Sequence, residues 1–238
     1  MPDTDQIVTL RTQVFGLFHE WAGAKPCLRV LAQFPSLEIY LAGGVVRNAV
    51  LGREVQPKDF DLFLGGDSVD AALQAWSSEG RTTAGPYGCP RWSPGGTGAY
   101  CDMIPIRRFT PGLWPCEDIV DVLNQFDFTG NALAFDLRDG VFFNPQNGLR
   151  DMRRRSLRAV RFDYPDEPFM AGQALGRRAI LWFRLLHYAA TLGLELEPIT
   201  RQWLIDGKKA FGQKAVFAAS FFEPAVDRST LHTLGIYV

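Results

Sequence analysis

The feature that most constrains the fold is an apolar segment that runs directly into a pair of glycines. Leu37 to Ala42 is apolar with β-branched and aromatic members, a pattern that predicts a buried strand. Gly43 and Gly44 follow at once, and Val45 to Leu51 then has a helical pattern. Asp59 to Leu64 predicts a second strand. The sequence therefore predicts a central unit of strand, glycine turn, helix and strand.

The second strand carries two aspartates, Asp59 and Asp61, two residues apart. Residues i and i+2 of a strand face the same side, with Cα atoms about 6 to 7 Å apart, so both carboxylates can converge on one or two divalent cations. Asp102, on the alternating pattern from Tyr100 to Arg107, is the candidate for a third catalytic acid. The acids indicate a Mg²⁺ or Mn²⁺ site for phosphoryl transfer. Exposed acids at a strand end are the alternative interpretation.

The glycine turn indicates a site for a triphosphate. Without side chains at Gly43 and Gly44, backbone N–H groups and a helix N-terminus can approach phosphate oxygens. Arg47, one helical turn further on, and Lys58, beside the acids, carry charges that suit phosphates. The alternatives are glycines required only by a tight turn and, equally open, a surface ion pair for Arg47.

Composition and length indicate a globular protein with a sizeable core. The chain has 238 residues, 47% of them hydrophobic, which suits one large domain or a catalytic domain with a small helical appendage. No apolar run approaches the roughly 20 residues that span a bilayer, and Met1 to Gln6 is unlike a secretory signal. We therefore expect a cytoplasmic protein without membrane contact. The scattered cysteines and histidines lack metal-ligand spacing, so free thiols are expected and zinc is not.

Further elements are predicted on both sides of the central unit. Helical patterns cover Ile7–Trp21, Leu28–Phe34, Ser68–Trp76, Glu117–Leu123 and Gln173–Leu192, and most of the later chain is also helical. Glu79–Ala99 suits a long loop or irregular hairpin, and Asn131–Leu137 with Val141–Asn144 suits a hairpin around Asp139-Gly140. We divide the chain into an N-terminal helical segment (1–36), a catalytic domain (37–167) and a small helical domain (168–238).

Several motifs resemble one known family. Leu41–Arg53 (LAGGVVRNAVLGR) and Lys58–Leu62 (KDFDL) look like the signature of the head domain shared by CCA-adding tRNA nucleotidyltransferases and bacterial poly(A) polymerases. Asp127–Leu133, Asn147–Met152 and Ser156–Val160 resemble later motifs of that family, in the same order. The resemblance covers roughly Leu37 to Val160, with a fainter echo in Arg184–Gly193, and Asn48 stands where the family usually has Asp.

The resemblance implies an α+β fold, namely a polymerase-β-like nucleotidyltransferase head domain with a small mixed sheet, followed by a short helical domain. It implies that Gly43, Gly44 and Arg47 hold the triphosphate, that Asp59 and Asp61 hold the metals, and that Asp127 and Asn131 shape the nucleotide pocket. Asp102 falls where the family carries its additional strand acid. The alternatives are that Asn131 caps a strand and that Asp127 forms a hinge salt bridge.

The chain also departs from the family pattern. Gln125 and Phe126 stand where the family has two arginines, and Arg178 and Leu181 stand where an acid and an arginine read the incoming base. The base selectivity of a CCA-adding enzyme is therefore not expected. The chain reaches Val238 before the full helical body of longer members. We expect either a different grip on the acceptor or a protein partner or second copy that supplies this surface.

These observations lead to one leading hypothesis and two alternatives. The protein is expected to transfer a nucleotide from a nucleoside triphosphate to an acceptor hydroxyl, with an RNA 3′ end, and tRNA in particular, as the leading acceptor. Nucleotidylation of a protein or small molecule is the first alternative, and a non-catalytic relative that binds nucleotide or RNA, or docks on a protein, is the second. Basic residues for an RNA backbone, or for a solvated face, are Arg150, Arg153, Arg154, Arg155, Arg158 and Arg161. The later aromatics, Phe211, Phe217, Phe221 and Phe222, favour core packing.

Overall fold

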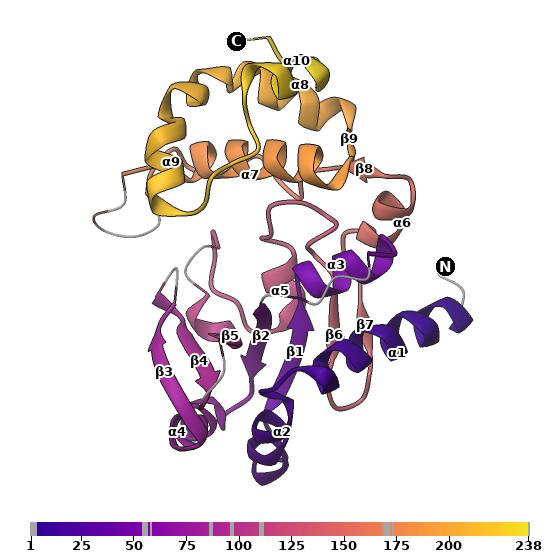
Figure 1. Cartoon of the computed structure of the whole chain (residues 1–238), viewed down its shortest axis with the longest axis vertical. Coiled ribbons are helices and arrows are strands. Elements are labelled where there is room, and N and C mark those ends of the chain that lie inside the picture. The colour runs from indigo at the N-terminus through magenta and orange to yellow at the C-terminus, as the bar shows by residue number, and fades with distance from the viewer. Residues whose placement is uncertain are drawn as a thin grey trace. The chain divides into compact units, whose positions relative to one another are not determined.

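The computed structural model describes residues 4–53, 57, 59–85, 88–95, 98–109, 112–168, 172 and 174–237 (Figure 1). The chain divides into two compact units. Unit 1 comprises Met1–Asn124 and Leu133–Pro145, and unit 2 comprises Gln125–Ala132 and Gln146–Val238. The polypeptide therefore passes from unit 1 to unit 2 at residue 125, returns to unit 1 at residue 133, and enters unit 2 again at residue 146.

This division differs from the domain limits predicted at residues 36 and 167. The N-terminal helices are part of unit 1, and segments 125–132 and 146–167 are part of unit 2. Long-range contacts cause the difference: the Tyr164 hydroxyl donates to the Gln125 carbonyl at 2.7 Å, and Phe128 forms a β-bridge with Ala159. Such contacts leave no local signal in the sequence, which shows only hydrophobic period and turn residues.

Unit 1 is built on one mixed, seven-stranded sheet with the order β3-β4-β5-β2-β1-β6-β7. Its strands are β1 (Glu38–Ala42), β2 (Asp59–Gly65), β3 (Gly80–Ala84), β4 (Pro90–Pro94), β5 (Tyr100–Pro105), β6 (Ala134–Asp136) and β7 (Phe142–Phe143). The β2–β5 pair is parallel, and every other neighbouring pair is antiparallel. The predicted mixed sheet is confirmed, and the hairpin β3–β4 extends it.

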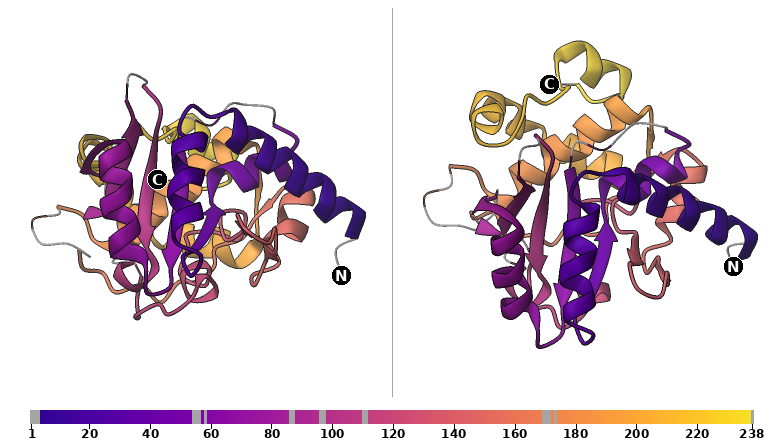
Figure 2. Two further views of the ribbon diagram at one scale, coloured as in Figure 1. Left: turned by 90° about the horizontal axis from the view of Figure 1, so that it is seen from below. Right: turned by 60° about the horizontal axis from the view of Figure 1, so that its bottom comes forward.

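Helices flank this sheet within unit 1. They are α1 (Thr4–Glu20), α2 (Ala24–Gln33), α3 (Gly44–Val50), α4 (Val69–Glu79), α5 (Ile119–Leu123) and the 3-10 helix η2 (Ile106–Arg108). Figure 2 shows α1, α2 and α4 on one face of the sheet. Phe18 and Trp21 pack there on Phe60, with ring centroids 5.6 and 5.2 Å apart. These aromatic contacts bury Phe60, between the two aspartates at the start of β2, and so fix the strand that carries them.

The local sequence signals agree well with these elements. The helices predicted near the N-terminus correspond to α1 and α2, and the strand, glycine turn and helix correspond to β1, Gly43 and α3. The hairpin predicted around Asp139-Gly140 is β6–β7, and Gly140 has the positive φ of 69° that such a turn favours. Both of its strands are shorter than predicted.

Unit 2 is mostly helical. Its elements are α6 (Gly148–Arg153), β8 (Ser156–Leu157), α7 (Arg177–Leu192), β9 (Glu195–Leu196), α8 (Pro198–Asp206), the 3-10 helix η3 (Lys208–Gln213), α9 (Lys214–Ser220) and α10 (Arg228–Thr233). Strands β8 and β9 form a parallel pair. The short helical domain expected from the resemblance is therefore present, with a small strand pair in addition.

Helix α7 is the core of unit 2. Trp182 and Phe183 on this helix are fully buried, and Phe183 stacks near Phe217 with ring centroids 4.8 Å apart. Phe217 also contacts Phe221 and Phe222 at 5.0 and 5.2 Å. These phenylalanines pack in a core, as the sequence favoured. In the described part of the chain, no helix combines the length and apolar character needed to cross a membrane.

Replacing Trp182 with Phe should destabilise unit 2. The buried indole Nε1 of Trp182 donates to the Leu204 carbonyl at 2.8 Å, and Phe leaves that carbonyl without its donor. We expect the free energy of unfolding in urea to fall by about 1–3 kcal/mol. In the control Trp114→Phe, where the side chain is exposed, a change within about 0.5 kcal/mol is expected. Equal losses in both variants would contradict this account.

Candidate active site

The glycine turn between β1 and α3 is the first component of the candidate site. Gly43 has φ 73° and ψ −130°, a conformation that is open almost only to glycine. A Cβ built on Gly43 would also lie 2.9 Å from Oδ2 of Asp61, which is closer than real Cβ contacts allow. The backbone and the neighbouring carboxylate therefore both require glycine, so the tight turn and the site depend on the same residue.

The register of the sheet places the predicted acids in one row. Asp61 on β2 pairs with Ala42 on β1 and with Asp102 on β5, and Asp102 in turn pairs with Arg91 on β4. Directly paired residues of neighbouring strands project from the same face of a sheet. Asp59, two residues before Asp61, shares that face. The structure thus brings Asp59, Asp61 and Asp102 together on one face, as predicted.

Asp59 is oriented by a tyrosine of the neighbouring strand. The two residues are paired in register, and the Tyr100 hydroxyl donates to Oδ2 of Asp59 at 3.0 Å. Burial, and then the negative charge and hydrogen bond of Asp59, raise the pKa of Tyr100 above its usual value. The phenol therefore stays protonated at neutral pH and keeps its donor role. Asp59 is otherwise exposed, and Asp61 is half-buried.

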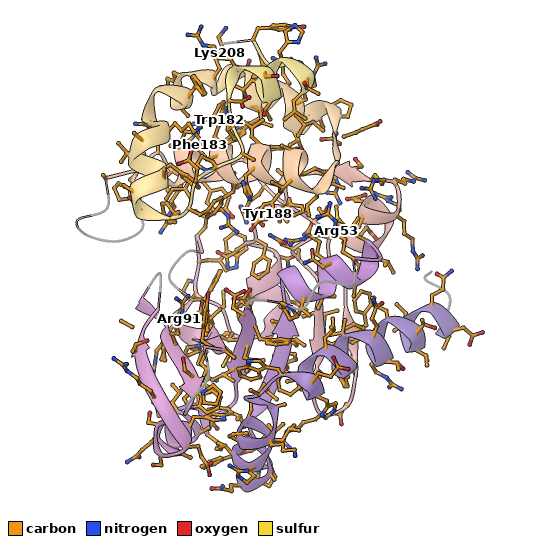
Figure 3. All side chains as sticks on the ribbon, in the orientation of Figure 1. Arg53, Arg91, Trp182, Phe183, Tyr188 and Lys208 are labelled. Atoms are coloured by element: carbon orange, nitrogen blue, oxygen red, sulfur yellow. The ribbon has the colours of Figure 1, made fainter. Side chains whose placement is uncertain are left out.

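Asp102 lies where the sequence predicted it, but both of its oxygens are bound by Arg91. The distances are 2.7 Å from Nε to Oδ1 and 2.9 Å from Nη2 to Oδ2, and Asp102 is only 8% exposed. Arg91 is labelled in Figure 3. Sequence reasoning missed it because Arg91 lies in the segment interpreted as a loop or irregular hairpin. Only the β4–β5 register reveals the pair.

A cysteine lies beside these acids. A Cβ built on Gly85 would be 3.2 Å from the Cys89 Sγ and 3.1 Å from Oδ1 of Asp102, so thiol and carboxylate are neighbours. Burial, followed by the charges of Asp102 and Asp61, raises the pKa of the Cys89 thiol to about 11. All four cysteines are free thiols, as the sequence indicated.

Arg47 on α3 is buried, so its side chain does not lie on the surface. It is 7% exposed, and its Nε and Nη2 donate to Oδ1 of Asn48 at 3.2 and 3.0 Å. The amide oxygen of Asn48 thus accepts these hydrogen bonds where the family usually has a carboxylate. Lys58, the other cation predicted for the phosphates, lies outside the described residues.

The second group of predicted residues lies in unit 2. Asn131 Nδ2 donates to both oxygens of Asp127 at 2.9 and 3.2 Å, and the backbone N–H of Phe128 also donates to Asp127. Arg184 on α7 binds Oδ2 of Asp127 through Nε at 2.9 Å and Nη2 at 2.8 Å. The Arg184 guanidinium also lies 5.4 Å from the ring centroid of Tyr188, labelled in Figure 3.

This network agrees with the salt-bridge alternative for Asp127, since the carboxylate binds an arginine of α7. The Nδ2 of Asn131 binds Asp127, and the strand-cap alternative for Asn131 stays open. That Asp127 and Asn131 shape a nucleotide pocket stays a prediction. Arg184 is the functional candidate that sequence reasoning missed here. The only sequence signal for Arg184 was that it begins the segment Arg184–Gly193, which weakly resembles the family.

The positions that depart from the family have unrelated packing roles. Leu181 is 5% exposed within the core of unit 2, and the guanidinium of Arg178 lies 5.9 Å from the ring centroid of Trp203. Gln125 is buried and its carbonyl accepts from Tyr164. None of these contacts resembles an acid and arginine pair available to read a base.

The arginine cluster of unit 2 is largely engaged in structural contacts. Arg150 and Arg158 both bind the buried carboxylate of Asp151, which also accepts from the Thr129 hydroxyl. The other two engaged members are Arg155, which donates to the Leu192 carbonyl, and Arg161, which pairs with Asp163. Arg153 and Arg154 are exposed and form no ion pair with another described residue. These two are the members best placed to meet a phosphate backbone.

The donor set of unit 1 fits a hard divalent cation. Asp59 and Asp61 present carboxylate oxygens from one face of β2, and Gly43 leaves room directly beside Asp61. Mg²⁺ is commonly held by one or two carboxylates, with waters and substrate phosphates as its other ligands. Within the described ranges, no group of three or more His, Cys, Asp or Glu side chains is arranged to hold a metal ion. The residues therefore suit a cation held by Asp59 and Asp61.

The fold of this chain is similar to that of several solved CCA-adding enzymes. One solved structure with a similar fold is a CCA-adding enzyme with CTP, with a TM-score of 0.67 at 16% identity, covering 94% of this chain and 54% of that one. Another is a tRNA nucleotidyltransferase complexed with a primer tRNA and an incoming ATP analog, with a TM-score of 0.59 at 22% identity, covering 82% and 54%. The predicted fold class is confirmed.

Sequence comparison points to the same proteins. The chain is 29% identical over 171 residues to the Multifunctional CCA protein of Xanthomonas oryzae pv. oryzae, covering 67% of this chain and 40% of that protein. It is 28% identical over 215 residues to the Multifunctional CCA protein of Xanthomonas axonopodis pv. citri, covering 82% and 48%. No protein-family model matches. The chain is thus similar in sequence to these two proteins and spans less than half of the length of either.

Replacing Gly43 with Ala should distort the turn and displace Asp61. The added Cβ would lie too close to Oδ2 of Asp61, and alanine at this position would have a strained backbone conformation. We therefore expect the free energy of unfolding to fall by about 1–3 kcal/mol. Gly52 is the matched control, since it also has a positive φ, of 66°, but nothing lies within 4 Å of its added Cβ. Gly52→Ala should cost less in the same urea titration. A Gly43→Ala protein as stable as Gly52→Ala would exclude the close approach.

Proposed function

We propose that this protein is a metal-dependent nucleotidyltransferase that transfers a nucleotide from a nucleoside triphosphate to an acceptor hydroxyl, with a tRNA 3′ end as the acceptor. The observation that carries the proposal is the pair Asp59 and Asp61 on one face of β2, beside a turn that only glycine can form. The similarity to proteins named for CCA addition supports the choice of acceptor.

Asp59 and Asp61 hold the Mg²⁺ or Mn²⁺ ion in this proposal, and Tyr100 fixes the orientation of Asp59 by its hydrogen bond. When bound, such an ion lowers the pKa of the acceptor hydroxyl and neutralises charge on the departing pyrophosphate. Gly43 and Gly44, with Arg47 and Lys58, hold the triphosphate. The Gly43 N–H donates to the Leu133 carbonyl at 3.3 Å, so Gly43 contributes by leaving room for a phosphate rather than by donating to it. Arg47 is suited to binding a phosphate because its cationic side chain is buried on the first turns of α3, directly after the glycine turn.

In unit 2, we assign Asp127 and Asn131 to the wall of the nucleotide pocket. Their mutual hydrogen bonds and the Arg184 ion pair hold both side chains in fixed orientations. A rigid polar wall suits binding of a planar base or a ribose, because little side-chain entropy is then lost on binding. Exposed Arg153 and Arg154 are assigned to the RNA backbone.

We further propose that the protein works in the cytoplasm, in keeping with its free thiols. We keep the division into a catalytic domain (37–167) and a small helical domain (168–238) as a proposal about function, because the two compact units describe only how the chain packs.

A transfer assay tests the proposal. Purified protein is incubated with Mg²⁺, each labelled triphosphate in turn, and tRNA. Label should appear on tRNA, and Asp59→Ala/Asp61→Ala should lower its rate by about 100-fold or more, because the cation contributes several kcal/mol of transition-state stabilisation. The control is Asp67→Asn in the same unit, whose side chain is 96% exposed and which should retain full activity.

Other results of this assay would contradict the proposal in distinct ways. Label on the protein itself would indicate protein nucleotidylation. Triphosphate binding without any incorporation would indicate a binding module. Label on tRNA that survives in Asp59→Ala/Asp61→Ala would exclude the assigned metal site.

Base selectivity should be weak. The positions that read the base in the family carry an exposed Arg178 that lies over Trp203 and a buried Leu181. An enzyme rejects a wrong base strongly when that base leaves buried donors and acceptors of the protein unpaired. Arg178 and Leu181 do not supply such a set of donors and acceptors, so this penalty is missing. We expect kcat/KM for the four ribonucleoside triphosphates to agree within about tenfold. A preference of more than about 100-fold for one base would show that another element reads it.

A further inference from the structure

One arginine lies in the row of acids that the proposed function assigns to catalysis. The sheet register runs Arg91, Asp102, Asp61 and Ala42 across β4, β5, β2 and β1. Paired residues project from the same face, so the guanidinium is part of the same polar surface as the metal-binding pair. This placement follows from backbone pairing and does not depend on one side-chain rotamer.

Arg91 is fixed on two sides. Its Nε and Nη2 bind the two oxygens of Asp102 in a bidentate pair, and its guanidinium carbon lies 4.1 Å from the ring centroid of Tyr100. Tyr100 in turn donates to Asp59. Bidentate arginine–carboxylate pairs and arginine–aromatic stacking are both geometrically specific, and lysine does not reproduce them. The arrangement is therefore a defined network that connects Arg91 with Asp102 and, through Tyr100, with Asp59.

The network also sets the charge of the row. Asp59, Asp61 and Asp102 contribute three negative charges on neighbouring positions, which repel one another unless cations balance them. Arg91 supplies one positive charge that is permanent, because guanidinium groups do not lose their proton in proteins. The pair Arg91–Asp102 is thus internally neutral, and Asp59 and Asp61 retain the two negative charges that match one divalent cation.

We propose that Arg91 is a positioning residue that keeps Asp102 out of the metal coordination sphere, so that the divalent cation binds through Asp59 and Asp61 alone. This inference rests on the proposed function and reassigns Asp102 from a third catalytic acid to the anchor of Arg91. Asp102 is the least exposed of the three acids, and its side chain is only 11% exposed. Breaking the pair to recruit Asp102 would leave an unpaired arginine beside the cation, and like charges disfavour that state.

A double-mutant cycle on metal affinity tests the inference without any catalytic turnover. Mn²⁺ alone is titrated into wild type, Arg91→Gln, Asp102→Asn and Arg91→Gln/Asp102→Asn, with free Mn²⁺ measured by electron paramagnetic resonance. Arg91→Gln should bind Mn²⁺ about threefold or more tightly, because the released carboxylate of Asp102 adds negative charge. Asp102→Asn should bind more weakly, because the released Arg91 competes for Asp59 and Asp61.

The double variant gives the decisive result. It removes a neutral pair and replaces it with two amides that can still hydrogen-bond, so its Mn²⁺ affinity should lie within about twofold of wild type. A double variant as weak as Asp102→Asn would show that Asp102 is a metal ligand and would overturn the inference. An Arg91→Gln protein that binds no more tightly than wild type would overturn it as well.

Two further proteins separate this inference from the proposed function and from a purely structural role. If Asp59→Asn binds Mn²⁺ as wild type does, the proposed metal site is wrong and the inference falls with it. If Asp59→Asn binds weakly and the double variant also binds weakly, only the assignment of Arg91 fails. Arg91→Lys keeps the charge but loses the bidentate pair and the stacking on Tyr100, so its Mn²⁺ affinity should lie between those of wild type and Arg91→Gln. Thermal melting of each variant confirms that it is folded.

Discussion

The hydrogen-bonded register of β2 between β1 and β5 is the constraint on which the candidate site depends. It sets Asp61 opposite Ala42 on one side and opposite Asp102 on the other. Because side chains alternate along a strand, a shift by one residue would carry Asp59 and Asp61 to the opposite face. The aromatic packing of Phe18 and Trp21 on Phe60, which lies between the two aspartates, opposes that shift, since Phe60 would then lose its buried position.

Electrostatics explains why the surroundings of the acids are so specific. Carboxylates on neighbouring strands are stable only when each has a donor or a cation. Tyr100 serves Asp59, Arg91 serves Asp102, and Gly43 leaves space beside Asp61. The three neighbours differ in kind, so the three acids are not equivalent. The two acids on β2 are more exposed than Asp102, and this asymmetry favours β2 as the proposed cation-binding strand.

Local sequence signals were sufficient for the elements and for the residues close together in the chain. The glycine turn, the pair Asp59 and Asp61, and the Gly140 hairpin each occupy a few consecutive residues whose chemistry is visible in the sequence. Arg91 was not predictable, because its partner Asp102 is opposed to it only through strand pairing. The contact of Arg184 with Asp127 spans 57 positions and has the same cause. Glycines and prolines between Glu79 and Ala99 favoured a loop or irregular hairpin over the regular strand pair that forms there, because cross-strand contacts stabilise it.

The interleaved path of the chain has a consequence for how the protein is made. Segment 125–132 packs in unit 2, yet it is followed at once by β6 and β7, which complete the sheet of unit 1. During synthesis, this segment must wait for residues beyond Gln146 before it finds its own core, while the strands that follow it can already pair. Neither unit is a contiguous stretch of polypeptide. A fragment cut at any single point therefore leaves part of one unit without its neighbours, so dissection by simple truncation will expose apolar surface such as that of Phe128.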